Sequence, residues 1–222
     1  MSPLHLLRNT PITAVLFDYG QVLSFPASAE VFARMARLLG HAPDAFALAY
    51  YERRLAYDRG DLSAEAYWTD LARRARPGSV LASEQLAMLR RWDIDMWNQT
   101  EPRMLGWLTE LRAAGFRTGL LSNMPEDLIV HFRAEGAWIQ LFDHLTFSQE
   151  VGLIKPEPEI YRHSLRGLGN AAENVLFIDD REENVATARE LGMDGICFRS
   201  TPGLRAELVL RAFSVLPASG GD

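Results

Sequence analysis

Short apolar runs, rich in β-branched and aromatic residues, recur along the chain, and each has the length of a buried strand. The expected strands are residues 13–18 (TAVLFD), 116–123 (FRTGLLSN), 144–148 (HLTFS), 174–179 (NVLFID) and 195–198 (GICF). Helical patterns separate the runs after the second, and another precedes the second run. Two of these patterns, residues 102–115 and 157–169, carry proline early and glycine at the end. This alternation predicts an α/β fold with a mainly parallel, Rossmann-like sheet.

The stretch between the first two expected strands is helical throughout in its apolar periodicity. Its expected helices are residues 27–39, 43–58, 63–76 and 83–97, separated by the turn sequences LGHAPD, DRGDLS and ARPGS. We therefore expect residues 25–99 to form an inserted all-helical cap domain. Residues 1–24 and 100–222 then form the α/β core.

Composition excludes several classes of protein. With 222 residues, 48% of them hydrophobic, the chain can bury a large core. A net charge of −6 with scattered arginines argues against nucleic-acid binding, and no apolar stretch approaches the length of a membrane span. The start MSPLHLLRNT lacks the features of an export signal, and the single cysteine, Cys197, fits a buried strand position in a cytoplasmic protein. No histidine pair has the spacing of a zinc site.

Chemically useful side chains mark the ends of the expected strands. Asp18 ends the first, Ser122 lies at the end of the second, Lys155 stands in GLIKPEPEIY, and Asp179 and Asp180 end the fourth. Ligands of open parallel sheets bind at the carboxyl ends of the strands, so these residues are expected to converge. Asp18 and Asp180 are suited to Mg²⁺, while Ser122 and Lys155 are suited to phosphate oxygens. The set predicts phosphoryl transfer, in which an aspartate can be the covalent nucleophile.

Each of these strand-end residues, taken alone, has a simpler interpretation. Asp18 fits a turn residue, Ser122 fits a helix cap ahead of Pro125, and Lys155 fits a solvated surface side chain. The sequence DDREEN fits a helix start with acidic residues in its first turn. The occurrence of all four in this order favours a site.

With these motifs, LFDYGQVL, LLSN, GLIKPEPEIY and FIDDREEN, nearly the whole chain resembles the haloacid dehalogenase superfamily with a C1-type helical cap. The resemblance implies that Asp18 attacks the substrate, and that Ser122 and Lys155 hold the transferring group. Asn123, beside Ser122, is assigned with it to substrate binding.

The resemblance also implies a Mg²⁺ site. Asp18, the carbonyl oxygen of Gly20 and Asp180 would be direct ligands, with Asp179 a direct or water-mediated one. Asn184 matches a position that supports the last motif, where the family usually has a second acid.

Gly20 departs from the pattern of the family's phosphatases, which usually carry there an aspartate that protonates the leaving group and activates water. Such general acid–base catalysis is typically worth about 10²–10⁴-fold. Three alternatives remain: a phosphatase in which another group moves the proton, a 2-haloacid dehalogenase, or a phosphate-dependent binding protein without turnover. Some sugar-phosphate phosphatases of the family, similar to glucose-1-phosphate phosphatase, have a D-x-G-x-V motif of this kind.

The paired acids of the last motif favour the phosphatase, because dehalogenation of a small carboxylate needs no Mg²⁺. We expect a Mg²⁺-dependent phosphatase that hydrolyses a small phosphorylated metabolite. Arg53, Arg54 and Tyr57 of YERRLAYDRG could face the site, but this sequence is also typical of a solvated helix face, which is the interpretation we favour.

Overall fold

The structure is a computed structural model that describes residues 11–219. Within this range, five parallel strands form one sheet in the order β3-β2-β1-β4-β5. The strands are β1 Ala14–Phe17, β2 Arg117–Ser122, β3 His144–Phe147, β4 Val175–Asp179 and β5 Asp194–Cys197. Each lies within two residues of its predicted ends, which confirms the predicted α/β fold with a parallel sheet.

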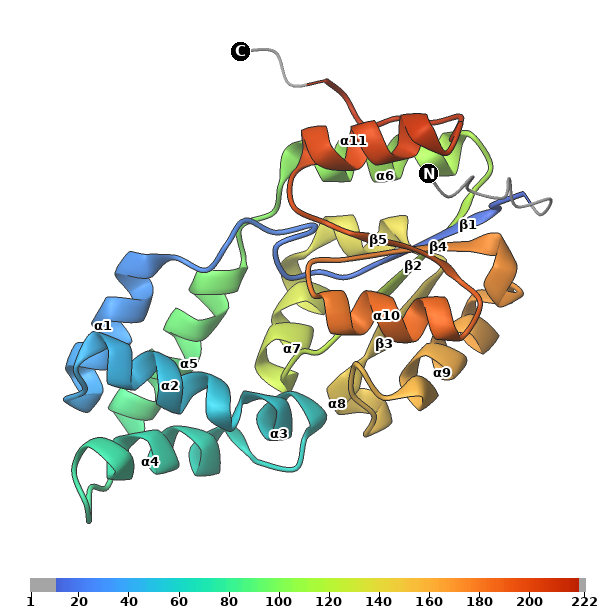
Figure 1. Cartoon of the computed structure of the whole chain (residues 1–222). Helices are drawn as coiled ribbons and strands as arrows, with labels where there is room; N and C mark the ends of the chain where they lie inside the picture. The colour runs from blue at the N-terminus through green and yellow to red at the C-terminus, as the bar shows by residue number, and fades with distance from the viewer. Residues whose placement is uncertain (1–10, 220–222) are drawn as a thin grey trace, which may run out of the picture.

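Helices cover both faces of this sheet, in three layers (Figure 1). They are α6 Pro102–Ala113, α7 Glu126–Glu135, α8 Ser148–Val151, α9 Pro158–Leu168, α10 Glu182–Glu190 and α11 Thr201–Leu210, with short 3₁₀ turns at η1 Ala137–Leu141 and η2 Ala172–Asn174. Side chains of β1 alternate between the faces, as the pleat requires. Val15 and Phe17 pack with α6, α7 and α11, whereas Ala14 and Leu16 pack with α9 and α10.

Residues 29–97 contain five helices and, in the structure, no strand. They are α1 Ala29–Leu39, α2 Pro43–Glu52, α3 Arg54–Arg59, α4 Ala64–Ala75 and α5 Ser83–Trp97. These helices pack around a hydrophobic cluster of their own, which includes the fully buried Trp68 and Tyr67. Figure 1 shows this group, which we call the helical unit, beside the sheet rather than on either face of it.

The two segments that connect the helical unit to the sheet lie side by side. Ser24 and Thr100 form an antiparallel bridge, and the amide of Phe25 donates to the carbonyl of Gln99 over 2.8 Å. The expected domain boundaries, 24/25 and 99/100, therefore meet at one place in the fold. The assignment of residues 25–99 as a separate cap domain stays a prediction.

One predicted helix, residues 43–58, was wrong as a single element. The chain forms two helices that meet at Arg53, whose φ of −106° and ψ of 1° depart from helical values. The second helix, α3, ends at Gly60, whose φ of +91° is in the left-handed region that favours glycine. The break turns α3 toward the sheet, where it packs against α8.

Cys197 lies in β5 as predicted but is half-buried rather than fully buried. Among residues 11–219, no helix has both the length and the apolar character needed to cross a membrane.

Candidate active site

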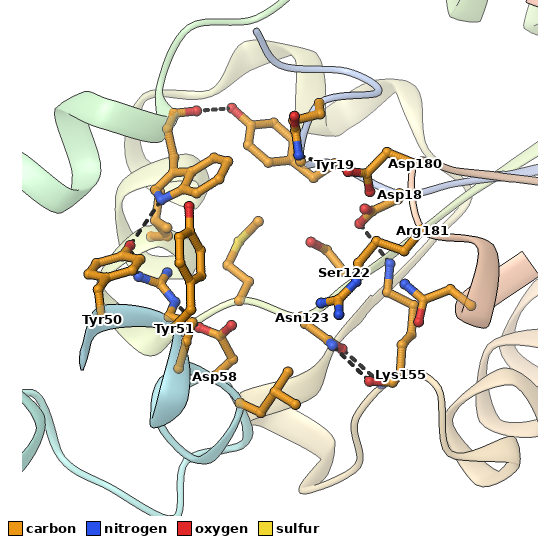
Figure 2. Close-up of a pocket in the computed structure, with 18 residues that line it drawn as sticks. Asp18, Tyr19, Tyr50, Tyr51, Asp58, Ser122, Asn123, Lys155, Asp180 and Arg181 are labelled. Carbon is orange, nitrogen blue, oxygen red and sulfur yellow. Dashed lines mark hydrogen bonds and ion pairs between the residues drawn. The ribbon is translucent and has the colours of Figure 1, made fainter. Parts of the chain in front are cut away.

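The central strand of the sheet positions the first functional residue. Asp18 follows β1 directly, and β1 pairs with β2 on one side and with β4 on the other. The chain order reverses beside this strand, so the ends of β2 and β4 flank Asp18 with Ser122 and Asp179. Figure 2 shows Asp18, Ser122, Lys155 and Asp180 around one cavity, as the sequence predicted.

Lys155 joins two of the strand ends by ion pairs. Its Nζ lies 2.7 Å from an oxygen of Asp18 and 2.7 Å from an oxygen of Asp179. The side chain is 2% exposed, so the interpretation of Lys155 as a solvated surface residue was wrong. It is also the single lysine of the sequence.

Burial and charge shift the pKa values of this group in opposing ways. Burial raises the pKa of Asp18 to about 7, even though the ammonium of Lys155 acts to lower it. Burial acts to lower the pKa of Lys155, but the two carboxylates outweigh it and the pKa is raised. Lys155 is thus held as a cation inside the protein.

Asp179 has its acceptor capacity filled by protein donors. Its two oxygens accept from the amide of Arg181 (2.9 Å), from the Asn184 side chain (2.9 and 3.0 Å) and from Lys155 (2.7 Å). An ionised carboxylate offers about four acceptor positions. Asp179 is fully buried, and its contacts indicate that it orients Lys155, with Asn184 holding it in place.

Asp180 is more open to a ligand. It is half-buried, and Gln21 Nε2 donates to its Oδ2 over 2.7 Å. Burial and the neighbouring Asp179 carboxylate raise the pKa of Asp180. Its position, at the cavity and beside Asp18, is shown in Figure 2.

Three carboxylates are close enough together for one cation. One oxygen each of Asp18, Asp179 and Asp180 lies within 4.8 Å of the others. Carboxylate oxygens are the ligands that Mg²⁺ prefers, usually one or two from the protein with water and phosphate completing the shell. The donor set therefore fits Mg²⁺, with Asp18 and Asp180 the carboxylates that have acceptor positions to spare.

Ser122 is the last residue of β2 and Asn123 follows it, and the two side chains make different contacts. The N-cap of α7 is Pro125 and no side chain caps it, so Ser122 is not the helix cap that it resembled. Ser122 is instead buried at the cavity wall. Asn123 binds the backbone of Lys155 twice, donating to its carbonyl (3.0 Å) and accepting from its amide (2.9 Å). This contact positions Lys155, and binding of substrate by Asn123 stays a prediction.

The cavity above these residues has a volume of about 460 Å³ and is closed on one side by the helical unit. Tyr50, Arg54 and Asp58 of that unit line it and are buried. The interpretation of YERRLAYDRG as a solvated helix face was therefore wrong for Arg54 and Tyr57, while Arg53 is partly exposed. The spacing of Arg54 and Asp58, four residues apart in α3, was a signal that these two share one helix face, whereas Tyr50 comes from α2.

Hydrogen bonds and ion pairs hold the helical unit against the core at several places. Ser148 Oγ donates to the carbonyl of Asp58 (2.5 Å) and accepts from the amide of Met124 (2.9 Å). Arg90 of α5 binds both oxygens of Asp127 in α7, and Arg59 pairs with Glu157. α3 and α5 thus both contact the core beside the cavity.

Gly20 leaves space at the position where the sequence lacks an acid. A Cβ atom built there would meet Trp97 Cζ3 at 3.8 Å, an ordinary van der Waals contact. The backbone of Gly20 is not in the left-handed region, although that of Gln21 is, with a φ of +59°. A side chain at position 20 is therefore compatible with the fold.

Comparison of the sequence with known protein families identifies the family of this chain. A model of the haloacid dehalogenase-like hydrolases matches residues 12–192. Sesquiterpene phosphatase astK of Aspergillus oryzae is 32% identical over 43% of this chain and 49% of its own. (S)-2-haloacid dehalogenase 1 of a Pseudomonas species is 23% identical over 84% of both chains. The chain spans about half, or less, of the length of the first curated relatives it matches.

Solved structures share the fold. HAD family enzyme BT-2542 of Bacteroides thetaiotaomicron superposes with a TM-score of 0.70 at 22% identity, covering 86% of this chain and 95% of that one. The same enzyme has been crystallised with magnesium and inorganic phosphate.

Proposed function

We propose that this chain, which belongs to the haloacid dehalogenase-like hydrolase family, is a Mg²⁺-dependent phosphatase that acts on a small phosphorylated metabolite. The observation that carries the proposal is the buried Lys155 between Asp18 and Asp179, with Asp180 beside them. A fixed cation next to an aspartate and a set of oxygen ligands is suited to a phosphoryl group, whose transfer depends on positioning and on neutralisation of charge.

Asp18 is the proposed nucleophile. A carboxylate oxygen of Asp18 would form a bond to phosphorus while the ester oxygen leaves with the bonding electron pair and takes up a proton. Water would then hydrolyse the aspartyl phosphate and restore Asp18. Lys155 and the hydroxyl of Ser122 would hold the oxygens of the transferring group.

Mg²⁺, when bound, would neutralise phosphate charge and hold the phosphoryl group in line with the nucleophile. Asp18, Asp180 and the carbonyl oxygen of Gly20 would hold it. Asp179, whose oxygens already accept four hydrogen bonds, would orient Lys155 beside the metal site. The magnesium and phosphate complex of BT-2542 supports this choice of ion.

Residues 25–99 would act as a cap over a core made of residues 1–24 and 100–222. The cavity between them supports this, because Tyr50 and Asp58 lie across it from Asp18 and Lys155 (Figure 2), and Arg54 lines it as well. A cap of this kind excludes water from the site and contacts the part of the substrate that is not transferred.

The alternative of a 2-haloacid dehalogenase has the support of one relative and of the missing acid at Gly20. The acidic cluster opposes it, because displacement of halide from a small carboxylate needs no bound cation. One assay separates the two: release of phosphate from p-nitrophenyl phosphate with Mg²⁺, compared with release of chloride from 2-chloropropionate in chelator. We expect phosphate release that stops in chelator and in Asp18→Asn. Chloride release without metal would overturn the proposal.

A further inference from the structure

The part of the cavity away from Lys155 is lined mainly by aromatic and aliphatic side chains. We call this surface the apolar wall; it consists of Tyr19, Tyr51, Leu55, Trp97, Met124 and Leu128. It combines residues of the helical unit with residues that follow β1 and β2. Figure 2 shows Tyr19 and Tyr51 on the opposite side of the cavity from Lys155.

Polar atoms of this region already bind one another. Tyr19 donates its hydroxyl to the carbonyl of Trp97 over 2.7 Å, and Trp97 Nε1 donates to the hydroxyl of Tyr50 over 3.3 Å. The Tyr50 hydroxyl in turn donates to Asp93 over 2.6 Å. These bonds occupy the hydroxyls of Tyr19 and Tyr50 and the indole N–H of Trp97, so the wall offers few groups that could bind the hydroxyls of a sugar.

The cations that line the cavity are also paired. Arg54 binds Asp58 at 2.7 Å and Asp93 at 3.0 Å, and Arg181 binds Glu183 at 2.5 Å. The buried group of Arg54, Asp58 and Asp93 therefore has a formal charge of −1 at neutral pH. A second anionic group on the substrate would meet no unpaired cation there, and the surplus carboxylate would repel it.

The mouth of the cavity continues this apolar character. Tyr51 is 53% exposed and Leu55 is 42% exposed, and both line the cavity. Exposed apolar side chains at a pocket opening gain free energy when a ligand covers them. An apolar group too long for the cavity would thus still find contacts at its rim.

We propose that the leaving alcohol of the substrate is uncharged and mainly apolar, and that the apolar wall selects it against sugar phosphates and against phosphates with a second anionic group. This inference rests on the proposed phosphatase activity. It names the group on the leaving side of the phosphorus, whereas Asp18 and Lys155 determine the group that is transferred.

Three six-carbon esters of primary alcohols test the proposal: hexyl phosphate, glucose 6-phosphate and 6-phosphogluconate. They share a similar leaving oxygen and differ in polarity and charge. With Mg²⁺ we expect kcat/KM to fall in that order, by at least ~10-fold from first to last, because covering two methylene groups is worth about that factor. Equal values, or a preference for either polar ester, would overturn the inference.

Variants at the rim give a second readout. Tyr51→Ser and Leu55→Ser should each raise KM for hexyl phosphate by about threefold or more, and should change KM for glucose 6-phosphate by less than about twofold. Leu48→Ser is the matched control, because Leu48 is 75% exposed on α2 and does not line the cavity. Equal effects of all three substitutions would contradict the role of the wall.

p-Nitrophenyl phosphate, assayed in parallel, separates the two proposals. If it is hydrolysed while hexyl phosphate is not preferred, the phosphatase stands and the apolar substrate class is overturned. If Mg²⁺ supports no hydrolysis of any of these esters, the proposed function fails and the inference fails with it.

Discussion

Lys155 Nζ lies 2.7 Å from a carboxylate oxygen of Asp18 and equally close to one of Asp179, at the end of the neighbouring strand β4. The contact links the loop after α8 to the ends of β1 and β4, and all three side chains are buried. A buried ion pair adds little net stability compared with an apolar substitute, but removal of one partner leaves an unpaired charge behind. The same contact therefore matters for the fold and for the chemistry.

Lys155→Met should test both roles. The variant leaves Asp18 and Asp179 without their shared cation, so we expect the free energy of unfolding to fall by about 3–5 kcal/mol at pH 7. Chemical denaturation measures this fall, and phosphatase activity should drop below detection. Arg166→Met is the control, because Arg166 is exposed on α9, and it should leave both quantities near wild type. An unchanged unfolding midpoint in Lys155→Met would show that the pair is not formed.

Asp180 and Asp179 should differ in their effects on Mg²⁺. Asp180→Ala removes a carboxylate with acceptor positions to spare, so we expect calorimetry to detect no Mg²⁺ binding. Asp179→Asn should weaken binding less, because that side chain acts through Lys155 and Asn184. A reversed ranking would identify Asp179 as the direct ligand.

Asp58 should make the stability depend on pH. Burial raises the pKa of Asp58 to about 6, above the ordinary value of 3.8, although Arg54 acts to lower it. The folded chain then binds this proton more tightly than the unfolded chain does. The stabilising contribution is complete below the unfolded pKa of 3.8 and is lost as the pH rises through about 6.

Asp58→Asn should remove that contribution. Relative to the variant, the wild type should lose about 3 kcal/mol of unfolding free energy between about pH 3.5 and pH 7, as measured by urea denaturation at each pH. Parallel pH profiles for the two proteins would show that Arg54 keeps Asp58 ionised throughout this range.

Arg90 should help to keep the helical unit closed. Arg90 of α5 binds Asp127 of the core, whereas Arg91 beside it pairs with Asp95 of its own helix at 2.9 Å. Arg90→Ala should speed limited proteolysis at residues 24–26 and 98–100 by about two- to fivefold, the range for an exposed ion pair. Arg91→Ala is the control and should be cut at the wild-type rate. Equal rates for all three proteins would mean that closure does not depend on this contact.

Gly20→Asp should restore the acid–base group that the site lacks. Position 20 has room for a side chain, with Trp97 Cζ3 3.8 Å from a Cβ placed there. We expect kcat for hexyl phosphate to rise about 10-fold or more, and kcat for p-nitrophenyl phosphate to change by much less, because an aryl leaving group needs little protonation. A circular dichroism melt checks folding. Equal effects on the two esters would show that another group already supplies the proton.

The sequence by itself determined the strands of the sheet and the site residues at their carboxyl ends. Strands buried on both faces, such as Ala14–Phe17, need an apolar residue at each position, and such runs are visible without a structure. The convergence of Asp18 and Asp179 then follows from the parallel sheet, since parallel strands bring their carboxyl ends to one edge. The helical stretch of residues 25–99 predicted a cap and the acidic residues predicted Mg²⁺, while the family resemblance added the roles of the individual site residues.

Only the tertiary structure decided what closes the site. Arg54 and Tyr57 lie in a sequence that suits a solvated helix, but they are buried because α3 packs against other helices of the unit: Arg54 binds Asp93 of α5, and Tyr57 stacks on Tyr67 of α4. Ser122 suited a helix cap by sequence, but the structure places Pro125 at that cap. Local sequence sets which positions share a face of a helix, but the burial of that face depends on a neighbour distant in sequence. The substrate-facing side of this cavity therefore became visible only when the helical unit was placed against the core.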